Sequence, residues 1–468
     1  MTQTAAYGTW KSPIGAADVA TGAVAVSYPT IAGGEVWWQE RRPSEGGRIT
    51  IMAAAAAAGA GAEPRELLPA PWNARTRVHE YGGKSYLPVP SLSLAGGFDL
   101  VFANFADQRL YAAGGAVDLA PDQPGEPGAG EPGAVVTEAG AAPLPLTPEG
   151  EGFRFADLSL SPNETEIWCV RETTRPLEGT EPPPGFHVGG GVAVRREIVA
   201  VPLDGSAADD AGAIRVLVSG AQFFAFPTAS PDGTRLAWIS WNHPNMPWDG
   251  TELRVGPATG DLTVAESDLV MGGPQESVIA PRWRDDATLY VLSDASGWWN
   301  PYEVAAAAGA VPRALHPLEE EFTEPLWQLG GRPFEVLADG RLVVQHGLGE
   351  FQLAVLDPGS GTLTGIALPG YRTTTGDVAT DGTAIAVVAG GPQAPLSVLR
   401  VAGGAPEAIR RPAVAPDPAY LPDARPVQLP GGPNGGVVHA IVYSPSNPAV
   451  AAPPGELPPF VVHVHGGP

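Results

Sequence analysis

One short unit recurs along this chain and sets the strongest limit on its fold. The unit is a turn rich in Gly, Asp or Asn, then a strand of alternating β-formers, a loop and a second strand. Its clearest copy is "SPDGTRLAWISW", which begins at Ser230 and is followed by "TELRVG" at Thr251. The turns of the seven copies are marked by Gly33, Gly97, Asn163, Asp232, Asp286, Asp339 and Asp381. Self-similarity of this kind is typical of repeat architectures.

Each copy predicts paired strands rather than helices. Apolar residues alternate with a period of 2, which places one face of a strand against a neighbouring sheet. The Asp-Gly and Gly-Gly pairs supply the positive φ that tight hairpins need. We therefore predict an all-β fold, a seven-bladed β-propeller of four-stranded blades at residues 31–410. The alternatives are a β-sandwich or several small β domains.

The two ends of the chain lie outside the repeat. Within residues 1–30, "SPIGAADVATGAV" combines a Ser cap, an early Pro and an Asp, which predicts a short helix. Residues 411–468 read as a linker, two strands and the closing "FVVHVHGGP". A continuous apolar run such as "FVVHV" is typical of a strand buried on both faces of an α/β sheet. Residues 411–468 are thus expected to begin an α/β domain.

Composition argues against several classes of partner. The formal net charge is −24, whereas nucleic-acid binding needs clustered Lys and Arg. No apolar stretch reaches about 18 residues, so we expect no membrane span. The first residues lack the pattern of a signal peptide. Cys169 is the single cysteine and sits in an apolar run, which suits a buried thiol and a cytoplasmic location. Assembly into a homo-oligomer stays open.

The chain resembles one known family along essentially its whole length, and four stretches carry the resemblance most specifically. They are "WNARTRVHEYGG", "LAWISWNHPNMPWDGTEL", "SDASGWWNPYE" and "VVHVHGGP". The chain resembles the prolyl-oligopeptidase family of serine peptidases, in its acylaminoacyl- and dipeptidyl-aminopeptidase-like branch. The resemblance implies a propeller ahead of an α/β-hydrolase domain, with residues 1–30 packing on that domain. It also implies short peptide substrates, with the propeller gating access, and no cofactor.

The "HGGP" turn carries the catalytic part of the resemblance. Glycine-rich loops of α/β-hydrolases supply donors to the oxyanion hole. By resemblance, His465 occupies the oxyanion-hole position, and the other interpretation is a turn residue without a role. His463 precedes it by two residues, but a His-x-His pair without a third ligand is weak, so no metal site is predicted.

The rest of a hydrolase active site is missing from the sequence. A nucleophile elbow reads Gly-x-Ser-x-Gly, and no such pentapeptide occurs in this chain. The triad of Ser, Asp and His would follow the glycine loop, so we assign none of its members. We expect a truncated start of a hydrolase domain and no activity from these 468 residues alone.

The propeller offers two weak candidates for substrate binding. Arg77 and Glu80 in "RTRVHEYGG" could reach a peptide's carboxylate or amine, or could form internal ion pairs. Trp248 and Asn242 in "NHPNMPWDG" could line a tunnel mouth or simply pack a long loop. Two other functions stay open: a stand-alone propeller that binds a protein partner without catalysis, and a lactonase-like propeller enzyme with its own metal site.

Overall fold

The computed structural model describes residues 2–55, 63–90, 98–114, 142–177, 181–413, 416–431 and 435–464. The described chain is nearly all strand, with α1 (Ala16–Thr21) as its α-helix. The predicted short helix is confirmed, although its cap is Gly15 rather than a Ser, and the Asp18 carboxylate accepts the Gly15 N–H at 2.7 Å. The predicted turn at Gly97 and the predicted oxyanion residue His465 lie outside the described residues.

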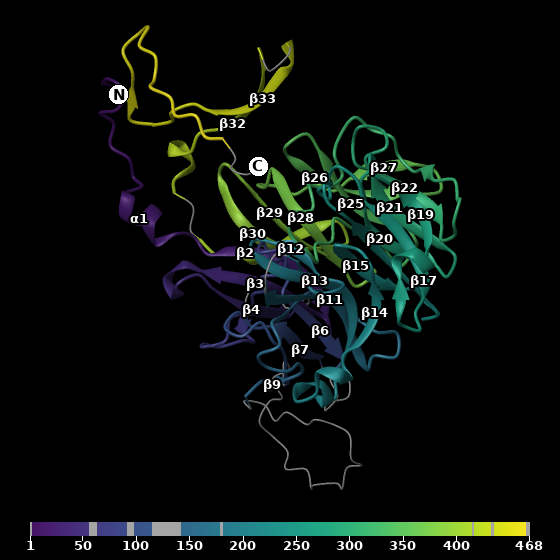
Figure 1. Ribbon diagram of the computed structural model, residues 1–468. Coiled ribbons are helices and arrows are strands. Elements are labelled where there is room, and N and C mark those ends of the chain that lie inside the picture. The colour runs from purple at the N-terminus through teal and green to yellow at the C-terminus, as the bar shows by residue number, and fades with distance from the viewer. Residues whose placement is uncertain are drawn as a thin grey trace.

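Antiparallel sheets follow one another in chain order (Figure 1). The first contains β2 (Ala25–Ala32), β3 (Glu35–Arg42), β4 (Arg48–Ala55) and β5 (Arg65–Glu66). The second contains β6 (Tyr86–Pro90), β7 (Phe98–Ala103), β8 (Leu110–Ala113) and β9 (Leu144–Pro145). The third contains β10 (Phe153–Leu160), β11 (Glu166–Pro176), β12 (His187–Gly189), β13 (Val192–Pro202), β14 (Arg215–Ser219) and the parallel β18 (Leu262–Thr263). Short turns join the first two strands of the first and third sheets, as the repeated turn residues predict.

The remaining sheets continue the same order. The fourth contains β15 (Phe223–Ala229), β16 (Arg235–Trp241), β17 (Glu252–Pro257) and β19 (Asp268–Gly272). The fifth contains β20 (Val278–Asp285), β21 (Thr288–Ser293), β22 (Asn300–Ala305) and β23 (Arg313–Ala314). The last contains β24 (Phe334–Val336), β25 (Leu342–Gly347), β26 (Phe351–Asp357), β27 (Thr362–Gly365), β28 (Thr373–Thr380), β29 (Ile385–Gly391), β30 (Ala394–Ala402) and β31 (Ala405–Arg410). Short 3-10 turns lie at Pro43–Glu45, Ser206–Ala208, Ala211–Ala213, Val264–Glu266 and Pro418–Tyr420.

The last sheet is two meanders joined at one point. β26 pairs with β28 only through Phe351 and Thr374, and four strands lie on either side of that junction. The all-β class is confirmed, whereas the number of seven blades stays a prediction because this sheet is continuous. The predicted turns that are described lie between the first and second strands of their meanders, so each sheet begins one strand earlier than expected. Residues 25–30, which we placed in the N-terminal segment, are therefore part of β2.

The first and last sheets pack on each other and close the series of sheets. β2 lies against β28 and β29. Val26 and Trp38 share one apolar cluster with Val388 and Val398. The first strands of successive sheets also contact each other along the chain, from β6 through β10, β15, β20 and β24 to β28. These first strands therefore form the inner ring of the fold, which is the arrangement of a propeller.

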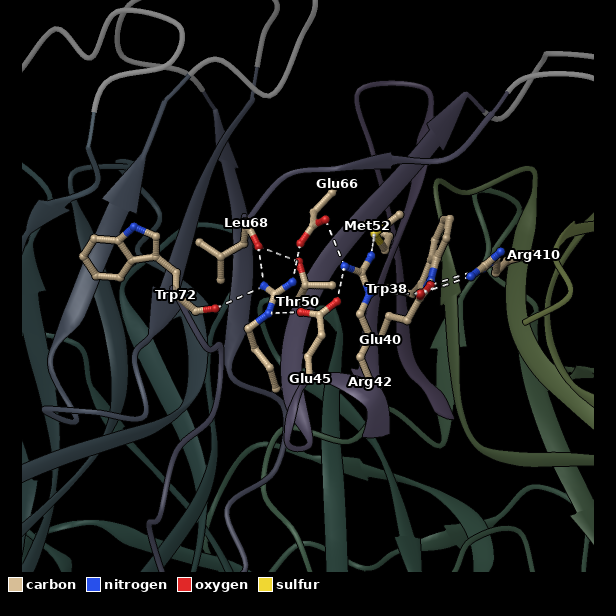
Figure 2. Close-up of polar contacts among 11 residues, drawn as sticks. Trp38, Glu40, Arg42, Glu45, Thr50, Met52, Glu66, Leu68, Trp72 and Arg410 are labelled. Atoms are coloured by element: carbon tan, nitrogen blue, oxygen red, sulfur yellow. Dashed lines mark hydrogen bonds and ion pairs between the residues drawn. The ribbon is translucent and has the colours of Figure 1, made fainter. Parts of the chain in front are cut away.

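A polar cluster lies beside this closure (Figure 2). Glu40 is buried on β3, and its two carboxylate oxygens accept from the guanidinium of Arg410 on β31 at 3.1 and 3.2 Å. Arg42 contacts Glu40 at 3.4 Å and also pairs with Glu45 and Glu66. The bidentate pair joins strands 370 residues apart in sequence, so it closes the ring with a charged contact as well as an apolar one.

The inner strands carry a second repeat that the sequence analysis missed. A β-bulge interrupts the register of β2, β10, β15, β20 and β28. The bulged residues with positive φ are Tyr28, Asp157, Phe226, Ala280 and Gly376. A bulge bends and twists its strand. Because the side chains at these five positions differ in type, no pattern in the sequence indicates the bulges.

The N-terminal segment and part of the C-terminal region lie together, away from the large sheets (Figure 1). β1 (Gln3–Thr4) pairs in parallel with β34 (Val450–Ala451), and the Tyr7 N–H donates to Glu456 at 3.0 Å. β32 (Ala424–Pro430) and β33 (Val437–Tyr443) form a separate hairpin. The predicted strand "FVVHV" is wrong for this structure. Residues 460–464 form no strand and their side chains are exposed, because no described strand pairs with them.

Candidate functional site

Two loops meet across the inner ring and form a cross-strap, residues 82–84 with 328–330. Gly83 bridges Leu329, whose N–H donates to the Gly82 carbonyl at 3.0 Å while its carbonyl accepts the Lys84 N–H at 2.9 Å. These loops precede β6 and β24, the first strands of two sheets that are not neighbours. The cross-strap therefore ties two separate parts of the ring at the end where the inner strands begin.

Glycine is required at both positions of the strap. Gly82 has a φ of +68° and Gly83 a φ of +148°. A Cβ at Gly82 would overlap the carbonyl oxygen of Thr76, and one at Gly83 would overlap that of Leu329. The "YGG" of the predicted cluster is thus explained by close backbone approach.

Two cavities share lining residues that directly precede the strap loops in sequence. One has a volume of about 560 Å³ and the other about 600 Å³. Tyr81, Leu326 and Trp327 line both cavities, so these side chains form the wall between them. Ligand pockets typically have volumes of roughly 300–1,000 Å³. Either cavity is large enough for a small molecule or a short peptide segment.

Five alternating charges form a chain along the first cavity. Arg77 pairs with Glu80 at 2.7 Å, and Glu80 pairs with Arg154 at 2.7 Å. Arg154 also contacts Glu172 at 3.0 Å, and Glu172 pairs with Arg196 at 2.7 Å. The predicted candidates Arg77 and Glu80 therefore do form an ion pair, and Glu80 in addition lines a cavity.

The electrostatics of this chain depend on burial. Glu172 is 3% exposed, so its charge is held by arginines rather than by water. Burial raises the pKa of Glu80, whereas hydrogen bonds from Arg154 and Arg77 lower it. The hydrogen bonds outweigh burial, so the pKa of Glu80 lies below its ordinary value. Burial lowers the pKa of Arg196, although Glu172 opposes that effect. The Glu80 carboxylate therefore stays ionised at neutral pH.

Backbone strain is concentrated at the same place. His79 and Glu80 have φ values of +55° and +63°, although neither is glycine. A non-glycine residue in such a region costs of order 1–3 kcal/mol and persists only where its surroundings hold it. Here the His79 N–H donates to Glu172 at 3.2 Å. Two consecutive residues of this kind at a cavity favour a binding role for the loop.

His79 leaves a polar atom without a partner. Its Nε2 is closed off from solvent and has no hydrogen bond within the described part of the chain. The ring packs edge-on against Phe223 and Trp241, at centroid distances of 5.2 and 5.9 Å. Burial, followed by the charge of Arg196, lowers the pKa of His79 well below its usual value. The imidazole is therefore neutral at pH 7.

Aromatic rings form the facing part of the cavity lining. Trp327 lies 4.4 Å from Trp248 and 5.7 Å from Tyr81, measured between ring centroids. Tyr81 and Trp327 are both partly exposed. Trp248 lines the cavity, whereas Asn242 accepts the Gln222 N–H at 2.8 Å.

Lys84 lies on the other side of the strap, among buried charges. Its ammonium donates to Thr30 at 2.8 Å, and burial together with Arg332 lowers its pKa to about 7. Asp377 accepts the Arg332 N–H at 2.7 Å, and burial raises the pKa of Asp377 to about 6. Both shifts have the sign of desolvation, which disfavours the charged form of each group.

These shifts predict an unusual pH dependence of stability. The unfolded chain holds the Lys84 proton up to about pH 10.5 and the folded chain only to about pH 7, so stability should rise between these values. The slope is at most about 1.4 kcal/mol per pH unit. Asp377 acts oppositely below pH 6, where rising pH should lower stability. Urea unfolding from pH 7 to 9.5 checks this, because Lys84→Met should remove the rise. An identical pH profile in the variant would contradict it.

The sequence analysis missed most partners of its candidates. Arg154 and Arg196 lie far from Glu80 in sequence, so only the fold brings them together. Glu172 and Arg196 are direct cross-strand partners of β11 and β13. Opposite charges at paired positions would have revealed them if the strand register had been known. His463 is exposed, and the described residues include no group of three His, Cys, Asp or Glu side chains that could hold a metal.

Solved structures similar to this chain are peptidases. A puromycin-hydrolysing peptidase of Mycobacterium tuberculosis is 48% identical, with a TM-score of 0.85 over 99% of this chain. A puromycin hydrolase is 39% identical, with a TM-score of 0.83 over the same share. This chain spans 65% of the length of each of those two. A prolyl endopeptidase, 13% identical, matches 89% of this chain and 54% of its own with a TM-score of 0.58, which shows the fold alone.

Comparisons by sequence found nothing further. No protein-family model matches the chain, and no curated protein matches it. Within the described residues, no helix is long and apolar enough to cross a membrane.

Proposed function

We propose that this chain is the propeller and oxyanion-loop portion of a serine peptidase that hydrolyses short peptides. Its structural neighbours are puromycin-hydrolysing peptidases and prolyl oligopeptidases, in agreement with the prolyl-oligopeptidase family. The observation that carries the proposal is 48% identity across 99% of the chain. At that level the similarity includes loops as well as strands. The fold alone would not suffice, since one fold serves many functions.

In this proposal the propeller gates access to the active site. The cross-strap closes part of the ring at the end where the inner strands begin, and the wall of Tyr81, Leu326 and Trp327 divides the space beside it. Cavities of about 560 and 600 Å³ would admit a short peptide but not a folded protein. The propeller would therefore admit only peptides that are small enough to enter these cavities.

The proposed division of the chain follows the sequence. Residues 1–24 would pack on the hydrolase domain, residues 25–410, which include all of β2, would form the propeller, and residues 411–468 would begin the hydrolase domain. The contacts of β1 with β34 support the first point, because they tie the N-terminal segment to the C-terminal region rather than to the sheets. The single, buried Cys169 suits the proposed cytoplasmic location, since one cysteine cannot form a disulfide within the chain.

His465 would supply the oxyanion-hole contact in the complete active site. We expect the 468-residue chain to hydrolyse no short peptide above a buffer blank, because its sequence contains no Gly-x-Ser-x-Gly nucleophile elbow. A form extended past Pro468 through such an elbow should hydrolyse short peptides. In that form His465→Ala should lower kcat by about 10²-fold, the scale of one oxyanion donor.

A matched control is His463→Ala, because His463 lies two residues earlier in the chain and has no proposed role. Its kcat should stay within about twofold of the unmodified form. Equal loss in the two variants would contradict the specific role of His465. Peptide turnover by the 468-residue chain would contradict the assignment of the nucleophile to the missing part.

A further inference from the structure

The row of five ion-paired side chains beside the first cavity includes N–H groups without a hydrogen-bond partner among the described residues. The oxygens of Glu80 accept from Arg154 and Arg77, and those of Glu172 accept from Arg154 and Arg196. Each carboxylate is thus already held by two arginines. Arg154, which lines the cavity, donates only through Nη1 within the described residues, so its Nε and Nη2 groups have no partner there.

The charge of the ligand follows from the numbers of arginines and carboxylates. Three arginines face two carboxylates, and the unused groups are N–H donors. A carboxylate could accept from Arg154 in a bidentate arrangement without displacing any existing pair. An ammonium group would have to displace an arginine from Glu80 instead. The arrangement therefore favours an anionic group of carboxylate geometry.

The aromatic wall adds a second requirement. Tyr81, Trp248 and Trp327 form one connected group of rings that borders the same cavity as Arg154. Aromatic faces of this size bind apolar or aromatic side chains through buried area and offset ring contacts. The ligand is thus charged at one end and apolar beside it.

His79 lines the cavity together with Arg154 and Trp327, and its edge-on contacts with Phe223 and Trp241 extend the aromatic lining.

We infer that this cavity binds the carboxylate end of a short peptide whose last side chain is aromatic or large and apolar. The carboxylate lies on Arg154, and the side chain packs on Trp327 and Tyr81. This inference rests on the proposed function, because it names the class of peptide that the propeller of such a peptidase would hold.

Calorimetric titration of the 468-residue chain tests it without any catalysis. The probes are alanyl-phenylalanine, its C-terminal amide and its N-acetyl form. Alanyl-phenylalanine should bind, the amide should bind at least about 10-fold more weakly, and acetylation should change Kd by less than about threefold. Equal binding of the amide, loss of binding on acetylation, or no saturable binding of the free dipeptide would each overturn the inference.

Variants locate the contacts. Arg154→Gln should abolish the preference for the free carboxylate, whereas Arg215→Gln should retain it, because Arg215 pairs with Glu166 away from this cavity. Trp327→Ala should weaken alanyl-phenylalanine and leave alanyl-alanine unchanged. An unaltered preference in Arg154→Gln would overturn the inference. Turnover by the extended form is measured separately, so failure of the proposed function and failure of this site are distinguishable.

Discussion

Replacing Gly83 with alanine should lower the free energy of unfolding by about 3 kcal/mol. The new Cβ would overlap the carbonyl oxygen of Leu329, so the strap would have to separate. Separation removes two backbone hydrogen bonds, worth about 1 kcal/mol each. The unfavourable φ of +148° adds a further cost of order 1 kcal/mol or more. Urea unfolding followed by tryptophan fluorescence measures the change.

Gly340→Ala is the matched control for this prediction. Gly340 also has a positive φ, of +84°, but its Cβ would meet nothing within 4 Å. Its cost should be about 1 kcal/mol, which is the backbone penalty alone. Equal losses in the two variants would show that the strap adds no stability beyond its backbone conformation. The strap would then have no role in tying the ring.

Arg410→Met should destabilise the chain by about 2–3 kcal/mol and loosen the contact between the first and last sheets. Glu40 is 2% exposed, so removal of its bidentate partner leaves a buried carboxylate with only the 3.4 Å contacts of Arg42 and Trp38. Breaking a buried pair from one side typically costs 3–5 kcal/mol, and Arg410 is itself 31% exposed, which reduces the value. Hydrogen exchange of β2 and β30 should increase together.

The control for this substitution is Arg341→Met. Arg341 pairs with Asp339 at 2.6 Å, but both side chains are about half exposed, so the loss should stay below about 1 kcal/mol. Adding Glu40→Gln to Arg410→Met should recover part of the stability, because no buried charge then lacks its partner. A loss as small as that of Arg341→Met would mean that the apolar cluster alone closes the ring.

Much of the fold could be predicted because each copy of the repeat begins with a recognisable turn residue. Asp232 and Asp381 mark hairpin turns. In each turn the Asp side chain accepts the backbone N–H two residues later, which restricts the residue types that suit the position. The inner bulges could not be predicted, since Tyr28, Asp157 and Ala280 have no side-chain type in common. The boundary at residue 31 was set too late because β2 precedes its turn and carries few alternating residues.

The candidate site was predictable only in part. Arg77 and Glu80 are close in sequence, so their proximity could be expected, whereas Arg154 and Arg196 reach Glu80 and Glu172 through sheet register. The "FVVHV" prediction was wrong here because a buried strand needs neighbours, and apolar character alone does not supply them.

The most direct test of the proposed peptidase is labelling with a fluorophosphonate probe, which reacts with an activated serine. The account predicts no labelling of the 468-residue chain and labelling of about one equivalent in a form extended through a Gly-x-Ser-x-Gly elbow. Alanine at the elbow serine should remove that label. Stoichiometric labelling of the 468-residue chain, or none in the extended form, would contradict the account.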